Sequence, residues 1–138
     1  MVWNQLRYFC TDEKWGNHKK INGALLLILD ELRHEIGHPF AIHCAYDTKG
    51  HSKNSQHYTG NAIDFHIVGL DLFTAYIKIV EVLKELQVNN RVGLGVYPDW
   101  NSPGFHIDLR GTKARWSRNK GDYVAIENAF QKGGTSGS

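Results

Sequence analysis

The chain has 138 residues, 41% of them hydrophobic, and its 16 Lys and Arg against 14 Asp and Glu give a formal net charge of +2. This length fits one domain that buries about two-thirds of its unfolded surface. The aromatic content and low net charge exclude a disordered chain, and two cysteines are too few for a disulfide scaffold. The small net charge gives no sign of binding to nucleic acid or to a membrane surface. Eight histidines are the unusual feature, so the question is whether some of them converge.

The ends of the chain carry no targeting pattern. No run approaches the roughly 18 apolar residues of a membrane span, and the start, MVWNQLRYFC, lacks the pattern of a signal peptide. We expect Cys10 and Cys44 to be free thiols. The last residues, GGTSGS, resemble a flexible linker. We therefore predict one domain over residues 1–130, a flexible tail or cloning remnant over 131–138, and a monomer.

Helical spacing of apolar residues predicts two main helices. The first covers residues 17–37, where Gly37 and a following proline are a stop signal. The second covers residues 71–86, with Asp71 as its cap. A short final helix is expected within residues 122–130.

Short apolar or alternating segments predict a small sheet. The polar segment 47–54 is predicted to be a loop, and Asn89-Asn90 is predicted to form a turn. The order of helices and strands indicates an α+β domain, with helices packed on a small antiparallel sheet that bears one metal site. The predicted strands are residues 40–45, 61–68, 91–97 and 104–109.

Two of these strands carry acidic and imidazole side chains on one face. Asp64 and His66 alternate with apolar residues on the first, and His106 and Asp108 do so on the other. If the strands pair, these polar side chains gather on one surface. A turn at Thr59-Gly60 would let the loop residue His57 fold back toward Asp64.

Two imidazoles and one carboxylate are a suitable ligand set for Zn²⁺. A catalytic zinc keeps three protein ligands and leaves a fourth position to water, whose pKa it lowers. The pattern therefore indicates hydrolysis of an amide or an ester. A polar strand face that is merely solvated, with no metal, is the alternative.

The string SxHxxGxAxD over residues 55–64 resembles the signature of the zinc D-Ala-D-Ala carboxypeptidases and their relatives, the LAS metallopeptidases of peptidoglycan. The segments GLGVYP (93–98) and FHIDLRG (105–111), followed by Arg115-Trp116, are similar to the second signature of that family. The order of the signatures and the gap between them also match. The resemblance covers most of residues 7–116 and implies a peptidase fold shared with Hedgehog-type domains.

The resemblance implies that zinc is held by His57, Asp64 and His106, with His66 as a less favoured ligand. Ser55 matches a position that helps to hold the carboxylate end of the substrate. We predict further substrate contacts from His51, which lies in the loop before the signature, and from Arg110, which shares the strand face of His106. His43 also alternates on its strand so that it can face the cleft.

The general base departs from the family pattern. Gly104 and Pro103 stand where relatives have an acidic residue or a histidine, and neither side chain can accept a proton. Asp108 is the first candidate for the base. Its rival role is to orient His106, as zinc ligands usually require, and both roles stay open. Asp99, in the preceding turn, is less favoured.

A second departure concerns the terminal carboxylate of the substrate. Many relatives bind it with an arginine just after the first strand, but this chain has Asp47 there. Arg110, Lys53 or Arg115 can substitute, or the enzyme cuts inside a cross-bridge. Carboxypeptidase and endopeptidase activities therefore both remain open.

Together these features predict a zinc-dependent peptidase that hydrolyses peptidoglycan stem peptides or cross-bridges, of the D,D-carboxypeptidase or endopeptidase type. The alternative is a non-catalytic, zinc-containing binding domain of the same fold. The location is left unknown, and a phage or prophage lysis enzyme (an endolysin) is a context that suits the chain. We expect no function for His18, His34 and His38.

Overall fold

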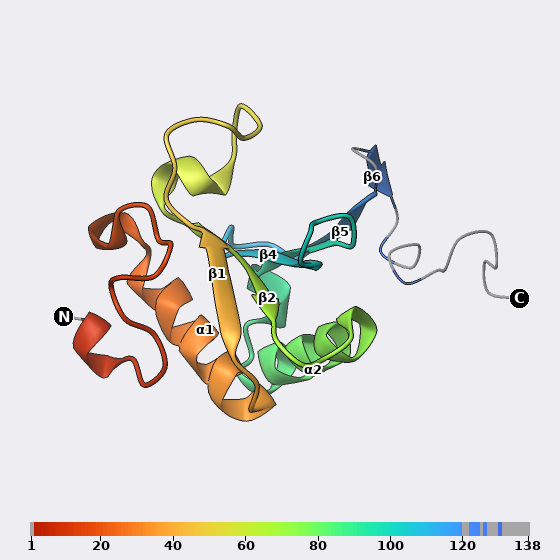
Figure 1. The fold of residues 1–138 in the computed structure, drawn as a ribbon, viewed down its shortest axis with the longest axis horizontal. Helices are drawn as coiled ribbons and strands as arrows, with labels where there is room; N and C mark the ends of the chain where they lie inside the picture. The colour runs from red at the N-terminus through yellow and green to blue at the C-terminus, as the bar shows by residue number, and fades with distance from the viewer. Residues whose placement is uncertain (1, 120–121, 125, 127–129, 131–138) are drawn as a thin grey trace, which may run out of the picture.

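A computed structural model describes residues 2–119, 122–124, 126 and 130 (Figure 1). The predicted tail, residues 131–138, lies outside them. The two helices are α1 (Gly23–Ile36) and α2 (Leu72–Glu85). The strands are β1 (Phe40–Cys44), β2 (Ala62–Ile67), β3 (Gly93–Tyr97), β4 (Gly104–Asp108), β5 (Ala114–Asn119) and β6 (Asp122–Val124). Short 3₁₀ turns are η1 (Val2–Gln5), η2 (His18–Lys20), η3 (Gln56–Thr59) and η4 (Asn89–Arg91). In this part of the chain, no helix has the length and apolar character needed to cross a membrane.

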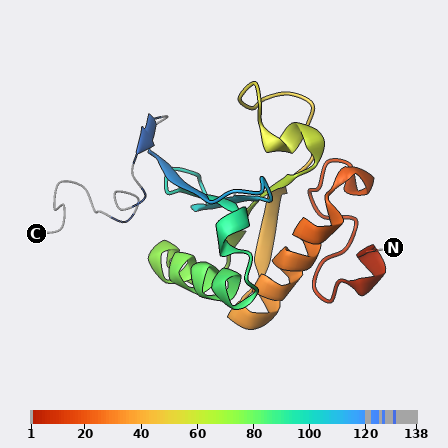
Figure 2. The same cartoon turned by 180° about the vertical axis from the view of Figure 1, so that it is seen from behind.

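The strands form one sheet in the order β1-β2-β4-β3-β5-β6. All neighbouring pairs are antiparallel except β3 and β5, which are parallel. Both helices lie on one side of the sheet, and the loop that carries η3 rises on the other side (Figures 1 and 2). The predicted α+β class with helices on a mostly antiparallel sheet is therefore confirmed.

The first helix begins later than predicted. Asn22 caps it, because its side-chain oxygen accepts hydrogen bonds from the amides of Ala24 (2.9 Å) and Leu25 (3.2 Å). The residues before this cap form the separate turn η2. The predicted end is correct, since Gly37 has the left-handed φ of 78° that suits a glycine after a helix. The second helix has the predicted cap, with Asp71 accepting from Thr74.

The chain after β4 differs most from the prediction. Residues 122–124, expected to begin a helix, form β6 and pair with β5 through Arg118 and Tyr123. β5 was not predicted, because its sequence, ARWSRN, shows no apolar alternation. It extends the sheet by pairing in parallel with β3, a contact that only the folded sheet provides. The rest of the predicted final helix falls largely outside the described residues.

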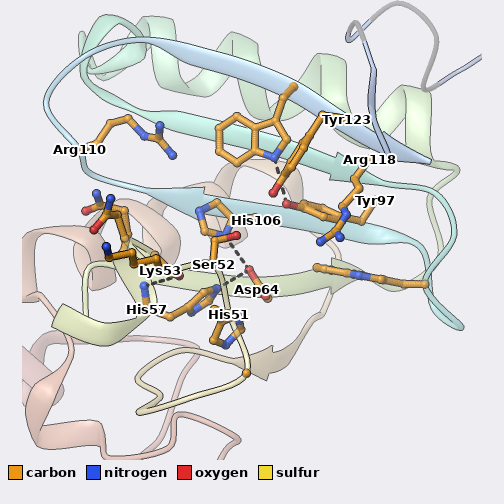
Figure 3. A pocket seen from close by; sticks show the side chains of 16 residues that line it. His51, Ser52, Lys53, His57, Asp64, Tyr97, His106, Arg110, Arg118 and Tyr123 are labelled. Carbon is orange, nitrogen blue, oxygen red and sulfur yellow. Dashed lines mark hydrogen bonds and ion pairs between the residues drawn. The ribbon is translucent and has the colours of Figure 1, made fainter. Parts of the chain in front are cut away.

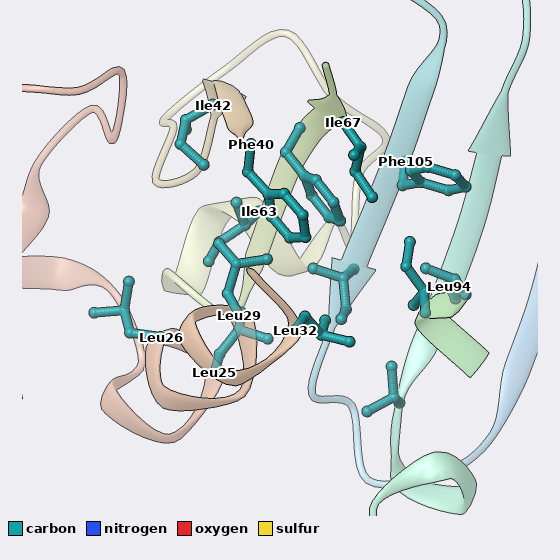
Figure 4. Packing of buried hydrophobic residues seen from close by; sticks show 14 of the residues in the cluster. Leu25, Leu26, Leu29, Leu32, Phe40, Ile42, Ile63, Ile67, Leu94 and Phe105 are labelled. Atoms are coloured by element: carbon teal, nitrogen blue, oxygen red, sulfur yellow. The ribbon is translucent and has the colours of Figure 1, made fainter. Parts of the chain in front are cut away.

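The hydrophobic core lies between the helices and the sheet (Figure 4). Leu25, Leu29 and Leu32 of α1 are fully buried against the apolar faces of β2 and β4. Because side chains alternate along a strand, burying Phe65 and Phe105 turns the polar residues of both strands to the opposite face. That face holds the candidate site.

Candidate metal centre

Three predicted ligands converge on the face of the sheet opposite the helices. Asp64 and His106 are directly opposite each other in the β2–β4 pair, and Asp64 Oδ1 lies 2.9 Å from His106 Nδ1. His57 comes from η3, and its Nε2 lies 3.1 Å from the same oxygen. One ligand atom from each of the three residues lies within 4.8 Å of the other two, and all three residues are buried.

A glycine turn brings His57 into place, as predicted. Gly60 ends η3 with φ of 72°, and its amide bonds back to the carbonyls of Gln56 and His57. A Cβ atom at this position would lie only 1.8 Å from the carbonyl oxygen of Lys20. The glycine is therefore required both for its backbone conformation and for the close approach of the η2 region. Ser55 fixes the other end of the turn, because its hydroxyl accepts a hydrogen bond from the amide of His57 (3.1 Å).

Each of the two imidazole rings is oriented by a hydrogen bond from its outer nitrogen, the one that points away from Asp64. His57 Nδ1 lies 2.6 Å from the carbonyl oxygen of Ala45, and His106 Nε2 lies 2.7 Å from Asp108 Oδ2. A carbonyl or a carboxylate can only accept, so each outer nitrogen carries the proton. The inner nitrogens then face Asp64, where each can offer a lone pair to a bound cation. Three acceptor groups that face one another in this way fit a cation, and their chemistry fits Zn²⁺.

Asp108 lies behind His106 and has no exposed surface. Arg110 holds it with two hydrogen bonds, from Nε to Oδ1 (2.8 Å) and from a terminal nitrogen to Oδ2 (2.7 Å). Space for this pair comes from Gly93 on the neighbouring strand, where a Cβ would lie 2.5 Å from Arg110 Nε. These contacts favour the second of the roles left open for Asp108, the orientation of His106.

The charges of the cluster compensate one another. Burial would lower the pKa of His106, but hydrogen bonds to Asp108 and Asp64 raise it to about 9. Burial would raise the pKa of Asp108, but Arg110 and His106 lower it to about 2. Burial also opposes ionisation of Asp64, yet its bonds to His106 and His57 bring its pKa well below the usual range. Both carboxylates are thus held as anions beside a protonated His106, and a metal ion would have to displace the proton from the inner nitrogen of that ring.

A second glycine makes room for an aromatic wall. Gly95 is opposite His106, and a Cβ there would lie 2.5 Å from ring atoms of Trp116. The indole packs 5.3 Å from the imidazole of His106 between ring centres, and it donates to the hydroxyl of Tyr97 (3.0 Å). Tyr97 in turn stacks on Trp100. The GxG of the predicted second signature therefore lets this wall approach the cluster.

The cluster opens into a cleft of about 870 Å³. The predicted substrate residues Ser55, His51 and Arg110 all line it, as does Lys53 (Figure 3). The ring of His51 stacks on that of His57, with centres 4.2 Å apart, and its Nε2 lies 3.1 Å from Asp47 Oδ2. Asp47 thus positions a side chain of the cleft.

Other candidates lie elsewhere. His66 Nδ1 is 2.6 Å from His43 Nε2, so these two pair with each other beside the cluster and do not join it. Arg115 is half-buried and donates to the carbonyls of Val92 and Asn89, away from the cleft. Asp99 does not line the cleft. The three histidines for which no function was expected, His18, His34 and His38, also do not line it.

Cys44 was not predicted to belong to the site. Its Sγ lies 3.5 Å from Asp64 Oδ2, and burial, followed by the charge of Asp64, raises the pKa of the thiol above its usual range. Cys44, His51 and His57 also bring ligand atoms within 4.8 Å, so this set overlaps the first at His57. Only the pairing of Cys44 with Asp64 in the β1–β2 register reveals the contact. Cys10 and Cys44 are both free thiols, as expected.

A buried His–Asp–His cluster at the base of an open cleft, on a sheet backed by two helices, is the kind of site that metal-dependent hydrolases use. Residues 2–116 match the protein family described as "Peptidoglycan L,D-endopeptidase MepK". The chain belongs to this family of M15 metallopeptidases, which is related to the D-Ala-D-Ala carboxypeptidases. The related family was thus predicted from the sequence. The predicted D,D type is not supported, because the family description names an L,D-endopeptidase.

Comparison with curated proteins and with solved structures found no match.

Proposed function

We propose that this protein is a zinc-dependent L,D-endopeptidase that cleaves peptide bonds in peptidoglycan. The observation that carries the proposal is the convergence of His57, Asp64 and His106 in a cleft of a chain that belongs to a peptidoglycan endopeptidase family. Endopeptidase activity also agrees with the sequence, since Asp47 occupies the position where relatives carry an arginine for a terminal carboxylate. No such terminus needs to be bound when the cut lies inside a cross-bridge.

In this proposal, His57 Nε2, Asp64 Oδ1 and His106 Nδ1 hold the zinc ion. When bound, zinc polarises the carbonyl of the scissile bond and lowers the pKa of a water molecule that attacks it. The outer-nitrogen contacts, to Ala45 and Asp108, fix the tautomer of each imidazole, so the ligand set is oriented before the metal arrives.

The remaining polar groups of the cleft contact the substrate. The hydroxyl oxygen of Ser55 accepts a hydrogen bond from the amide of His57. The hydroxyl proton therefore stays available for a hydrogen bond to a substrate carbonyl. His51, held by Asp47, presents its ring beside the ligand His57. Arg110 reaches the cleft while it holds Asp108, so it links the substrate to the orientation of His106.

Synthetic cross-linked peptides test this proposal. One set carries an L–D scissile bond and the other a D–D bond of otherwise equal structure. We expect the zinc-loaded protein to cleave the L–D set only, a chelator to stop cleavage, and His57→Ala to be inactive. Cleavage of the D–D set alone would overturn the L,D specificity. A protein that binds one zinc per chain and cleaves neither set would instead be the non-catalytic binding domain.

A further inference from the structure

A second group of metal-ligating side chains lies beside the first cluster. Cys44, His51 and His57 each place one ligand atom within 4.8 Å of the other two. His57 is shared with the first cluster, whereas Cys44 and His51 belong to the second group alone. A thiol and two imidazoles are ligands that suit thiophilic divalent ions such as Zn²⁺, and the first cluster has a carboxylate in place of the sulfur. The two groups therefore offer different ligand sets around one histidine.

An irregularity in β1 brings the thiol to this position. The register of the β1–β2 pair shifts between Ile42 and Cys44. Cys44, and not His43, is therefore opposite Asp64. Opposite residues of a strand pair share one face of the sheet, and a bulge re-aims the side chains next to it. The shift thus places the sulfur on the ligand face, where the thiol donates to Asp64 Oδ2 (3.5 Å) and Sγ lies 4.0 Å from His57 Nδ1.

The loop before η3 supplies the second imidazole in an ordered position. The ring of His51 lies over that of His57, with 4.2 Å between the centres and 21° between the planes (Figure 3). Its Nε2 contact with Asp47 orients the ring, as outer carboxylates and carbonyls orient the imidazoles of the first cluster. The phenol of Tyr58 accepts from the amide of His51 (2.9 Å) and donates to its carbonyl (2.7 Å), which fixes the loop at this residue.

An ion at the second group disturbs the first cluster through either nitrogen of His57. If the ion binds Nε2, it takes the atom that faces Asp64 and the catalytic position. If the ion binds Nδ1, it breaks the 2.6 Å contact with the carbonyl of Ala45 that orients the ring. The second group is also open to solvent, because Cys44 and His51 are both partly exposed.

We propose that Cys44, His51 and His57 form a second metal site for a thiophilic divalent ion, and that an ion bound there inhibits the peptidase. A coordinating thiol is deprotonated, so binding releases the proton of Cys44 to solvent. The ion weakens the hold of the first cluster on its metal and occupies His51, a substrate contact in the proposed function. The inhibition therefore rests on the proposed function, whereas the metal site itself does not.

Cadmium binding tests the site without any hydrolysis. A bond between Cd²⁺ and a thiolate gives an ultraviolet charge-transfer band that imidazole and carboxylate ligands do not give. Cys10 is the other cysteine of the chain and is exposed, so Cys10→Ser is the matched control and the background for the titration. We expect the band when Cd²⁺ is added to zinc-loaded Cys10→Ser, and no band when Cys44→Ser is combined with it.

A variant of the loop tests whether the thiol binds as part of the group. In the same background, His51→Ala should weaken the affinity measured from the band by more than about tenfold, because losing a ligand costs at least as much as losing a group that orients one. This variant leaves β1 untouched, and thermal unfolding verifies that each variant is folded. A midpoint equal to that of the background would overturn the three-ligand site.

Excess zinc tests the inhibition. For each variant, the rate of hydrolysis of cross-linked peptide in excess zinc is divided by the rate at one zinc per chain. We expect this ratio to fall at least about fivefold for the natural protein and for Cys10→Ser, as is typical of two linked ligand sites. The ratio should stay near one for Cys44→Ser and for His51→Ala, which each lack one ligand of the second site. A serine hydroxyl can still donate to Asp64, so Cys44→Ser keeps that contact.

The two readouts separate this inference from the proposed function. A cadmium–thiolate band that depends on Cys44, without hydrolysis by the zinc-loaded protein, would support the metal site and overturn the proposed function. Hydrolysis by a protein that gives no such band would overturn the metal site and leave the proposed function intact. Equal inhibition of Cys44→Ser and the natural protein by excess zinc would overturn the inhibitory role.

Discussion

Replacing Asp108 by asparagine separates the two roles that the sequence left open for this residue. Asp108 is fully buried and accepts one hydrogen bond from His106 and two from Arg110. An amide of the same size keeps one acceptor oxygen but turns an NH₂ group toward at least one of these donors. The variant therefore disturbs the support of His106 with little change in volume.

The magnitude follows from the contact with His106. Loss of a group that orients a metal ligand typically weakens metal affinity about 10–100-fold, or about 1.4–2.8 kcal/mol. If Asp108 orients His106, the dissociation constant of zinc should rise by this factor, and kcat at saturating zinc should fall by less than about tenfold. A general base contributes about 10²–10⁴-fold to the rate instead.

Zinc affinity by competition with a chromophoric chelator, and kcat at saturating zinc, are the two measurements needed. Asp71→Asn is the matched control, because it makes the same change at the exposed cap of α2, where asparagine caps as well as aspartate does. Unchanged zinc affinity together with a loss of about a hundredfold or more in kcat would refute the orienting role and restore Asp108 as the base.

Three further outcomes are expected. Gly60→Ala should lower the free energy of unfolding in urea by more than about 1 kcal/mol, because a methyl group there meets the carbonyl of Lys20 as well as a left-handed backbone. Gly50→Ala shares the positive φ but has nothing within 4 Å, so an equal loss in both variants would contradict the steric cause. Gly95→Ala should cost about 1–3 kcal/mol by displacing Trp116, and an unchanged midpoint in urea would show that the wall is not tightly packed. Chelation of zinc should lower the melting temperature and stoichiometric zinc should restore it, whereas a melting temperature indifferent to zinc would argue against a metal bound by the folded state.

The sheet face that bears the metal ligands could be predicted from the sequence because alternation is local. The apolar positions around Asp64 and His106 determine which way these two side chains point, and the structure keeps that assignment. The helix end at Gly37 and the cap at Asp71 were also local signals, since each depends on a single residue and its immediate neighbours.

Features that depend on the pairing of distant segments could not be predicted from local sequence patterns. The strand β5 carries charged residues and joins the sheet only through a parallel contact with β3. Its side chains Trp116 and Arg118 line the cleft, yet their sequence gives no alternating pattern. The contact of Cys44 with Asp64 likewise depends on the β1–β2 register, including an irregularity after Ile42.

The specificity of cleavage was beyond the sequence motifs for a different reason. The ligand set determines the metal chemistry, which L,D and D,D peptidases can share. Most of the other residues that line the cleft come from the loop before η3 and from β5, largely outside the family signatures.

Mass spectrometry of fragments released from purified peptidoglycan tests the central claim most directly. We expect fragments that end at a cleaved L–D peptide bond when the protein is loaded with zinc, and no fragments after chelation or with His57→Ala. Intact peptidoglycan after incubation with protein that carries one zinc per chain would contradict it.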